Sequence, residues 1–152
     1  MSRVARSARV ASKQRTEALS STAKTIVAAE TGELYIITSA TPGALTLPAA
    51  ADGAYFKVVW GIPTTGNAVF VAPAGAYFIG TVTHLLNGAS VENNIAVVGD
   101  TEIRLTLAKG GSGTNCAGVG SQIEFVSDGT YWYLSAMIIA DHADNAATFA
   151  TS

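Results

Sequence analysis

The chain has 152 residues, of which 49% are apolar and 13% are charged. This length fits a single domain with its own core, and so few charged groups predict that part of the surface is covered in an oligomer or by a partner. The sequence has no apolar run of 18 residues, so no membrane-spanning helix is expected. The lone Cys116 excludes an intrachain disulfide.

Charge is distributed unevenly along the chain. The first 24 residues carry six basic side chains and one acidic one, a net charge of +5, whereas the rest carries three basic and ten acidic side chains, a net charge of −7. Residues 1–23 have no Gly or Pro and few large apolar side chains. These features predict a basic arm, disordered alone or ordered on binding, that is attached to an acidic body.

Three roles are open for this arm. It could be a solvated tail without function, since chain termini are often loose. It could dock on an acidic protein surface, where each exposed ion pair would contribute roughly 0.2–1 kcal/mol. Nucleic-acid binding is the third role, but no aromatic side chain is interleaved with the basic ones, and the acidic body would repel phosphate. We therefore favour docking on a protein.

Beyond the arm, the chain breaks at short intervals into strand-like segments separated by turn residues. Their expected ranges are 24–29, 33–39, 43–47, 55–60, 68–72, 76–82, 90–98 and 101–107. Glu30-Thr31-Gly32 predicts a hairpin between the first two ranges, and Asn87-Gly88 predicts another. Segment 101–107 has the clearest alternation of apolar and polar side chains, which is typical of a strand with one buried face.

Segment 122–139 predicts two strands joined at Asp128-Gly129, a dipeptide that suits a two-residue type I′ turn with positive φ at both central positions. In the second strand, the even-numbered residues from Trp132 to Ile138 share one face, and Tyr131, Tyr133 and Met137 lie on the other. Because both faces are largely apolar, we expect one to pack in the core and the other to be covered by another chain.

About ten short strands, with turn signals roughly every 8–12 residues, are typical of an all-β protein. The expected fold is an antiparallel β-sandwich, jelly-roll-like, that forms a single domain over residues 24–139. The arm over residues 1–23 precedes it. A tail over residues 140–152 follows it, and this tail is either frayed or crosses to a neighbouring subunit with Phe149 as the anchor. The connections are too short for crossover helices, which excludes a parallel α/β sheet, and no repeat of about 20–50 residues indicates a solenoid.

No group of residues predicts catalysis. Cys116, His84 and His142 lie in no recognisable nucleophile–base or zinc-ligand pattern. The glycine-rich stretch 109–120 lacks the Gly-Lys-Ser/Thr and G-x-G-x-x-G spacings of phosphate-binding loops, so we interpret it as a connecting loop. We therefore expect no enzyme activity, no cofactor and no metal site.

Four segments together resemble a recurrent module of tailed-bacteriophage virion proteins. They are residues 24–37, Leu45-Thr-Leu-Pro48, residues 53–59 and residues 125–134, the last containing the pattern V-S-D-G-T-x-W-Y. The resemblance spans residues 24–139. The module occurs in head decoration (cement) proteins and in tail-fibre and spike segments, usually as trimers.

The resemblance implies a structural virion protein without catalytic residues. The basic arm and the single-domain length favour a trimeric decoration protein that is assembled in the host cytoplasm, binds the major capsid protein on the outer surface of the phage head, and binds neither nucleic acid nor membrane. In this interpretation, the capsid contact is assigned to Arg3, Arg6, Arg9, Lys13 and Arg15. The trimer contact is assigned to Tyr131, Tyr133, Met137 and Ile139. A tail-fibre or spike module that binds host glycans is the alternative, and a polysaccharide depolymerase fragment would need an acid pair that the sequence does not offer.

Overall fold

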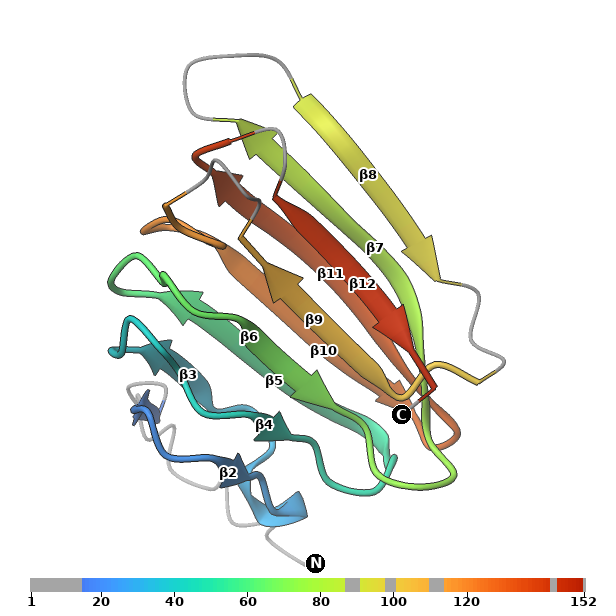
Figure 1. The fold of residues 1–152 in the computed structure, drawn as a ribbon. Helices are drawn as coiled ribbons and strands as arrows, with labels where there is room; N and C mark the ends of the chain where they lie inside the picture. Colours follow the sequence, from blue (N-terminus) through green and yellow to red (C-terminus); the bar gives the residue numbers. More distant parts are fainter. Residues whose placement is uncertain (1–14, 87–90, 98–100, 110–113, 143–144, 152) are drawn as a thin grey trace, which may run out of the picture.

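The chain folds into two facing β-sheets (Figure 1). The computed structural model describes residues 15–86, 91–97, 101–109, 114–142 and 145–151, with the backbone alone for 91–97. Its strands are β1 (Thr16–Leu19), β2 (Lys24–Thr25), β3 (Leu34–Ile37), β4 (Leu45–Thr46), β5 (Asp52–Trp60), β6 (Ala68–Val71), β7 (Tyr77–Leu86), β8 (Val91–Val97), β9 (Arg104–Ala108), β10 (Gln122–Asp128), β11 (Tyr131–Ala140) and β12 (Ala146–Ala150). The only helical turn within these ranges is the 3-10 helix η1 (Ala28–Glu30). The prediction of an all-β chain is confirmed.

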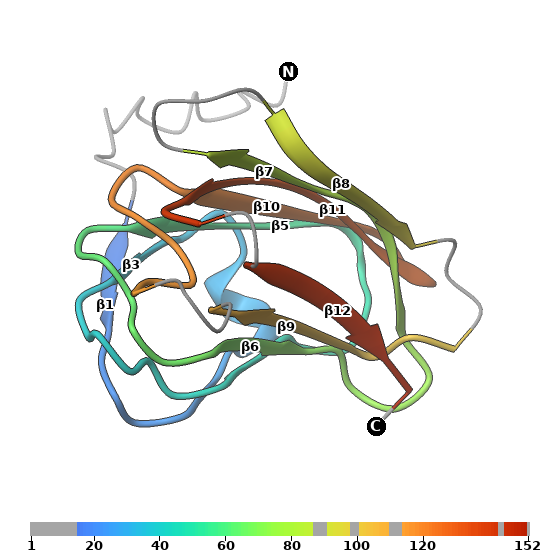
Figure 2. The ribbon, with the colours of Figure 1, turned by 45° about the horizontal axis from the view of Figure 1, so that its top comes forward.

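The larger sheet has the strand order β1-β3-β5-β10-β11-β7-β8, and the smaller sheet has the order β12-β9-β6-β4-β2. Figure 2 shows the two sheets as separate layers, with the core between them. Side chains alternate between this core and the outside: in β5, Phe56 and Trp60 are buried, while Tyr55 and Lys57 lie on the outer face. Nothing helical in the described ranges is long and apolar enough to cross a bilayer.

Both sheets are mixed, so the predicted antiparallel pairing is found in only part of the sandwich. Parallel pairs join β1 to β3, β3 to β5 and β7 to β11 in the larger sheet, and β2 to β4 and β4 to β6 in the smaller sheet. From β1 to β6, the chain crosses to the other sheet after every strand. Within β1 to β6, each crossover between parallel neighbours is therefore a strand of the opposite sheet, where an α/β protein would use a helix. The jelly-roll connectivity is not confirmed.

The hairpin expected in segment 122–139 is present as β10 and β11, which pair antiparallel up to Ser127 and Trp132. Its turn differs from the prediction, because only Gly129 has positive φ (92°) and Asp128 does not. The Asp128 carboxylate accepts hydrogen bonds from the backbone N–H groups of Thr130 (2.8 Å) and Tyr131 (2.9 Å), which stabilises a longer turn. The prediction of a two-residue type I′ turn is therefore wrong.

The other two expected turns have different outcomes. The hairpin predicted at Glu30-Thr31-Gly32 is wrong, because β2 and β3 belong to different sheets and η1 connects them. Asn87-Gly88 lies outside the described residues, although the strands on either side of it, β7 and β8, pair antiparallel.

The core between the sheets is rich in aromatic side chains. Phe70 of the smaller sheet lies 5.6 Å from Phe125 and 6.2 Å from Trp60 of the larger sheet, measured between ring centroids. Trp132 is fully buried, and its indole N–H donates to the carbonyl oxygen of Pro48 at 3.2 Å. Burying a side chain of this size contributes roughly 1.5–3 kcal/mol. The even-numbered face of β11 is buried, as its alternation predicts.

The sandwich extends beyond the predicted domain at both ends. β1 lies within the range assigned to the arm, pairs with β3 and buries Leu19, so the predicted boundary at residue 24 is too late. β12 lies within the range assigned to the tail and pairs antiparallel with β9. Phe149 packs against the core of its own chain. Residues 1–14 lie outside the described residues.

Candidate assembly surface

The four residues predicted for the trimer contact lie together on the outer face of β11. Tyr131, Tyr133, Met137 and Ile139 occupy alternate positions and point away from the core. Tyr133 is 40% exposed and Met137 is 38% exposed. Large apolar side chains that are grouped in the open are more informative than single ones, because grouped surface is what a partner covers. Whether another subunit covers them stays a prediction.

Neighbouring strands widen this row into a surface. Across the sheet, Tyr133 lies between Val126 of β10, which is 44% exposed, and Ile79 of β7. Val126 in turn lies beside Tyr55 of β5. We call the surface formed by Tyr55, Ile79, Val126, Tyr131, Tyr133 and Met137 the outer apolar face. Sequence reasoning missed its members on β5, β7 and β10, because alternation shows which residues share a face of one strand but not which strands are neighbours.

One ion pair lies within the outer apolar face. The Lys57 Nζ of β5 is 2.8 Å from the Glu124 Oε1 of β10, and the two residues are cross-strand neighbours. The side chains are 25% and 43% exposed, so the pair contributes about 0–1 kcal/mol to the stability of the single chain. Its more important effect is that each charge is neutralised within the chain.

The two tyrosines at the hairpin end of this face meet edge to face. The ring centroids of Tyr131 and Tyr133 are 6.4 Å apart, and the rings are inclined at 69°. The Tyr133 hydroxyl donates to Asp128 at 2.9 Å. Hydrogen bonds from the backbone N–H groups of Tyr131 and Thr130, and then from this hydroxyl, lower the pKa of Asp128. In turn, the hydrogen bond to the Asp128 carboxylate raises the pKa of Tyr133. Rings at this angle do not form one flat platform for a sugar.

Of the five basic residues assigned to the capsid contact, Arg15 is the one that the structure describes; Arg3, Arg6, Arg9 and Lys13 lie outside the described ranges. The Arg15 guanidinium lies 2.9 Å from the carboxylate of Glu33, whose side chain is only 4% exposed. A buried carboxylate without a counter-charge is costly, so Arg15 has a role in the fold. Its role in docking stays a prediction.

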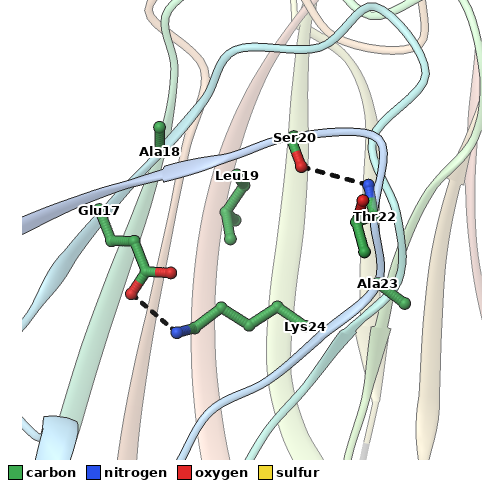
Figure 3. A pocket seen from close by; sticks show the side chains of 7 residues that line it. All are labelled: Glu17, Ala18, Leu19, Ser20, Thr22, Ala23 and Lys24. Carbon is green, nitrogen blue, oxygen red and sulfur yellow. Dashed lines mark hydrogen bonds and ion pairs between the residues drawn. The ribbon is translucent and has the colours of Figure 1, made fainter.

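A second group of ion pairs links β1 and β2 at one side of the sandwich, where these two strands belong to different sheets. Lys24 Nζ lies 2.7 Å from Glu17 and 3.1 Å from Glu30, and Figure 3 shows the Glu17 contact beside a hollow lined by residues 17–20 and 22–24. Burial opposes the charge on Lys24, but these hydrogen bonds outweigh it and raise its pKa. The pKa of Glu30 is lowered, mainly by the hydrogen bond from the backbone N–H of Val27 and then by Lys24, although burial acts in the opposite direction.

The carboxylates at this flank do not make a convincing metal site. Oxygen atoms of Glu17, Glu30 and Glu33 lie within 4.8 Å of one another. Lys24 already forms ion pairs with the first two, and Arg15 pairs with the third. We therefore interpret the cluster as an ion-pair network that holds the edges of the two sheets together.

Two groups with potential chemistry are buried in the core. Burial raises the pKa of the Cys116 thiol, which is fully buried and lies 2.9 Å from the Thr64 hydroxyl. A protonated, inaccessible thiol is a poor nucleophile. His84 is 2% exposed, and neither ring nitrogen has a hydrogen-bond partner in the described part of the chain. Burial lowers the pKa of His84, so the ring is neutral near pH 7.

Asp141 fastens the end of the glycine-rich loop. Its carboxylate accepts hydrogen bonds from the backbone N–H groups of Thr114 (2.8 Å) and Asn115 (2.9 Å), and from the Thr114 hydroxyl. The side-chain amide of Asn145 donates to its other oxygen at 3.2 Å. Burial acts against the charge, but these donors, led by Thr114, lower the pKa of Asp141 to about 2. Sequence reasoning gave Asp141 no such contact, because the loop lies far from it in the chain.

No family model, curated protein or solved structure matches this chain.

Proposed function

We propose that this chain is a structural virion protein that assembles as a trimer and binds the outer surface of a phage capsid, which it stabilises. The observation that carries the proposal is the outer apolar face, where Val126 and Tyr133 are exposed side by side on neighbouring strands and Met137 is exposed further along the same strand as Tyr133. Grouped exposed apolar surface of this kind is typical of protein contact sites. The resemblance to phage decoration modules suggests the kind of assembly.

In this proposal, the trimer presents three basic N-terminal arms to neighbouring copies of the major capsid protein. Individually weak arm contacts become tight together, because the second and third contacts form at a high effective concentration. A protein that binds the assembled shell and not its free subunits stabilises the shell by mass action. The proposal does not depend on jelly-roll connectivity, since it requires only a rigid sandwich with an exposed face and an arm.

A tail-fibre or spike module that binds host glycans is the second candidate. The observation in its favour is that Tyr133, an exposed aromatic ring, lies beside the Asp128 carboxylate at a hairpin end. Two features weigh against it: the Tyr133 hydroxyl already donates to Asp128, and the rings of Tyr131 and Tyr133 are steeply inclined. Binding of the isolated protein to a glycan array would favour this candidate.

Cosedimentation with decoration-free phage heads tests the proposal. The structure decides where the arm should be cut: a deletion of residues 1–14 leaves β1 and the Arg15–Glu33 ion pair intact, whereas a deletion that reaches residue 22 would remove a strand. The matched control keeps the arm length and replaces Arg3, Arg6, Arg9 and Lys13 by Gln.

The full-length protein should bind heads saturably. Binding should weaken at high salt, which screens the charges of the arm, and also after the deletion and in the Gln variant, which remove those charges. Absence of binding by the full-length protein at both low and high salt would contradict the proposal and favour the tail-fibre candidate.

A further inference from the structure

The outer side of β5, β10, β11 and β7, on which the outer apolar face lies, is nearly large enough for a stable contact. β11 and β7 pair over ten residues, from Tyr131 with Tyr77 to Ala140 with Leu86. With strands about 4.8 Å apart and about 3.3 Å per residue, the four strands β5, β10, β11 and β7 present a surface of about 20 Å by about 30 Å. Such a surface approaches the roughly 800 Å² per partner that a standard interface buries.

The middle of this face carries no unbalanced charge. Between Tyr133 and Met137, the outward row across the four strands consists of Lys57, Glu124, Ser135 and Thr81. The two charged members are paired with each other at 2.8 Å, and the other two are neutral. A strongly acidic or basic partner would find no net charge to match here. An identical face can approach without repulsion between like charges, so charge complementarity favours a second copy of this chain.

We infer that, in the proposed trimer, the outer apolar faces of the three copies pack around a shared three-fold axis, and that the Lys57–Glu124 pair is buried between the copies as a neutral unit. This inference rests on the proposed trimer and names the surface that forms it. Val126 and Tyr133 on one side of the pair, and Met137 on the other, supply the apolar contact. The Lys57–Glu124 pair is compatible with burial in the interface, because its two charges already neutralise each other. A single unpaired charge buried in the same place would be strongly unfavourable.

The test is the association of the full-length chain, measured by analytical ultracentrifugation over a range of concentrations. Val126→Arg places a charge in the outer apolar face, and Val27→Arg is its matched control, since Val27 is a 55% exposed valine outside that face. Val126→Arg should weaken association by about 30-fold or more, and Val27→Arg should leave it unchanged. Val126→Thr adds no charge and should weaken association less than Val126→Arg. It keeps the inference testable if the Val126→Arg variant does not fold.

The ion pair has its own distinctive result. Glu124→Gln alone leaves Lys57 unpaired and should weaken association by about tenfold, whereas the double variant Lys57→Met, Glu124→Gln should associate about as tightly as the unmodified chain. Thermal unfolding of each variant separates these effects from loss of folding.

Three results would overturn the inference. They are an unmodified chain that stays monomeric, association that is unchanged in both Val126 variants, and a Lys57→Met, Glu124→Gln double variant that associates no more tightly than Glu124→Gln alone. If Val126→Arg still associates but no longer binds phage heads, the face docks on the capsid and the inference is wrong. Failure of the unmodified chain to bind heads would count against the proposed function alone, because the association measurement contains no capsid.

Discussion

The outer faces of the two sheets carry side chains of different sizes. The larger sheet exposes Tyr133, Val126 and Met137. On the smaller sheet, the outward positions of β9 and β12 carry the charged Arg104 and small residues such as Thr106, Ala146 and the exposed Thr148. Both sheets enclose the same core, so the demands of folding do not explain the difference. Large apolar groups on one face are therefore better explained by a partner than by the fold.

The largest expected effect comes from breaking the larger sheet itself. Gly80 of β7 lies opposite Leu134 of β11 with φ at 144°, and a Cβ at this position would overlap the Leu134 carbonyl oxygen. Gly80→Ala should lower the free energy of unfolding by about 2–5 kcal/mol, because strain and overlap add. Chemical denaturation measures this. Gly75→Ala is the control for positive φ alone, since no atom lies within 4 Å of its added Cβ, and it should cost about 1 kcal/mol. Equal costs for the two variants would contradict the close approach of β7 and β11.

Loosening the junction between the sheets should have a smaller effect. Asp141 follows β11 of the larger sheet, and Asn145, which donates to it, precedes β12 of the smaller sheet. Asp141→Ala should cost about 1–3 kcal/mol, because several hydrogen-bond donors lose a charged acceptor, and Asp141→Asn, which keeps one acceptor, should cost less. Chemical denaturation near pH 7 measures both variants. If the outer apolar face does not depend on this junction, neither variant should change self-association of the folded chain. A change in self-association would show that the junction orients the outer apolar face.

The inner face of the larger sheet should respond to pH in a way that its outer face does not. In the unfolded chain, an ordinary histidine takes up a proton below about pH 6.5, whereas burial lowers the pKa of His84 in the folded chain. The unfolded state therefore binds more protons in this window, and stability should fall as the pH drops below about 6.5, by up to about 1.4 kcal/mol per pH unit. Denaturation at about pH 7.5 and about pH 5.5 should show this slope, and His84→Leu should reduce it. An unchanged slope in the variant would mean that another group is responsible.

The smallest expected effect on stability comes from exposed positions on the outer faces of the two sheets. Tyr133→Ser on the larger sheet and Thr148→Ser on the smaller sheet both change exposed side chains. Thr148→Ser should change the unfolding free energy of the single chain by no more than about 0.5 kcal/mol. Tyr133→Ser should lower it by about 1 kcal/mol, because it removes the edge-to-face contact with Tyr131 and the hydrogen bond to Asp128. Both are measured at concentrations too low for association. A larger loss for Tyr133→Ser would show that this residue serves the fold, and the face would then need no partner to explain it.

Much of the burial pattern could be predicted from the sequence, because alternation is a local property. The hairpin of β10 and β11 and the inward positions of β9 were predicted in this way, and the structure confirms them. The turn was mispredicted because Asp128 does not adopt positive φ, and its side chain instead accepts hydrogen bonds from the backbone of a longer turn. The parallel pairs were missed because a strand in the opposite sheet can act as a crossover, and a crossover of that kind leaves no helical pattern in the sequence.

Predictions for the functional surface were limited for the same reason. The outward side of β11 was predicted from one strand, but its neighbours Val126, Ile79 and Tyr55 depend on strand order, which involves contacts distant in the chain. The first strand was assigned to the arm because most of its side chains are polar or small. Leu19 is its only buried side chain, and contacts such as Arg15–Glu33 and Glu17–Lys24, which depend on the fold, hold it in place.

One paired measurement tests the central claim most directly: sedimentation of Tyr133→Glu beside Thr148→Glu, with the unmodified chain as reference. Each variant places one negative charge on an exposed strand position, but on opposite faces of the same sandwich. The account predicts that the unmodified chain and Thr148→Glu sediment alike as trimers, and that Tyr133→Glu sediments as a folded monomer. Identical association of the two variants would contradict it.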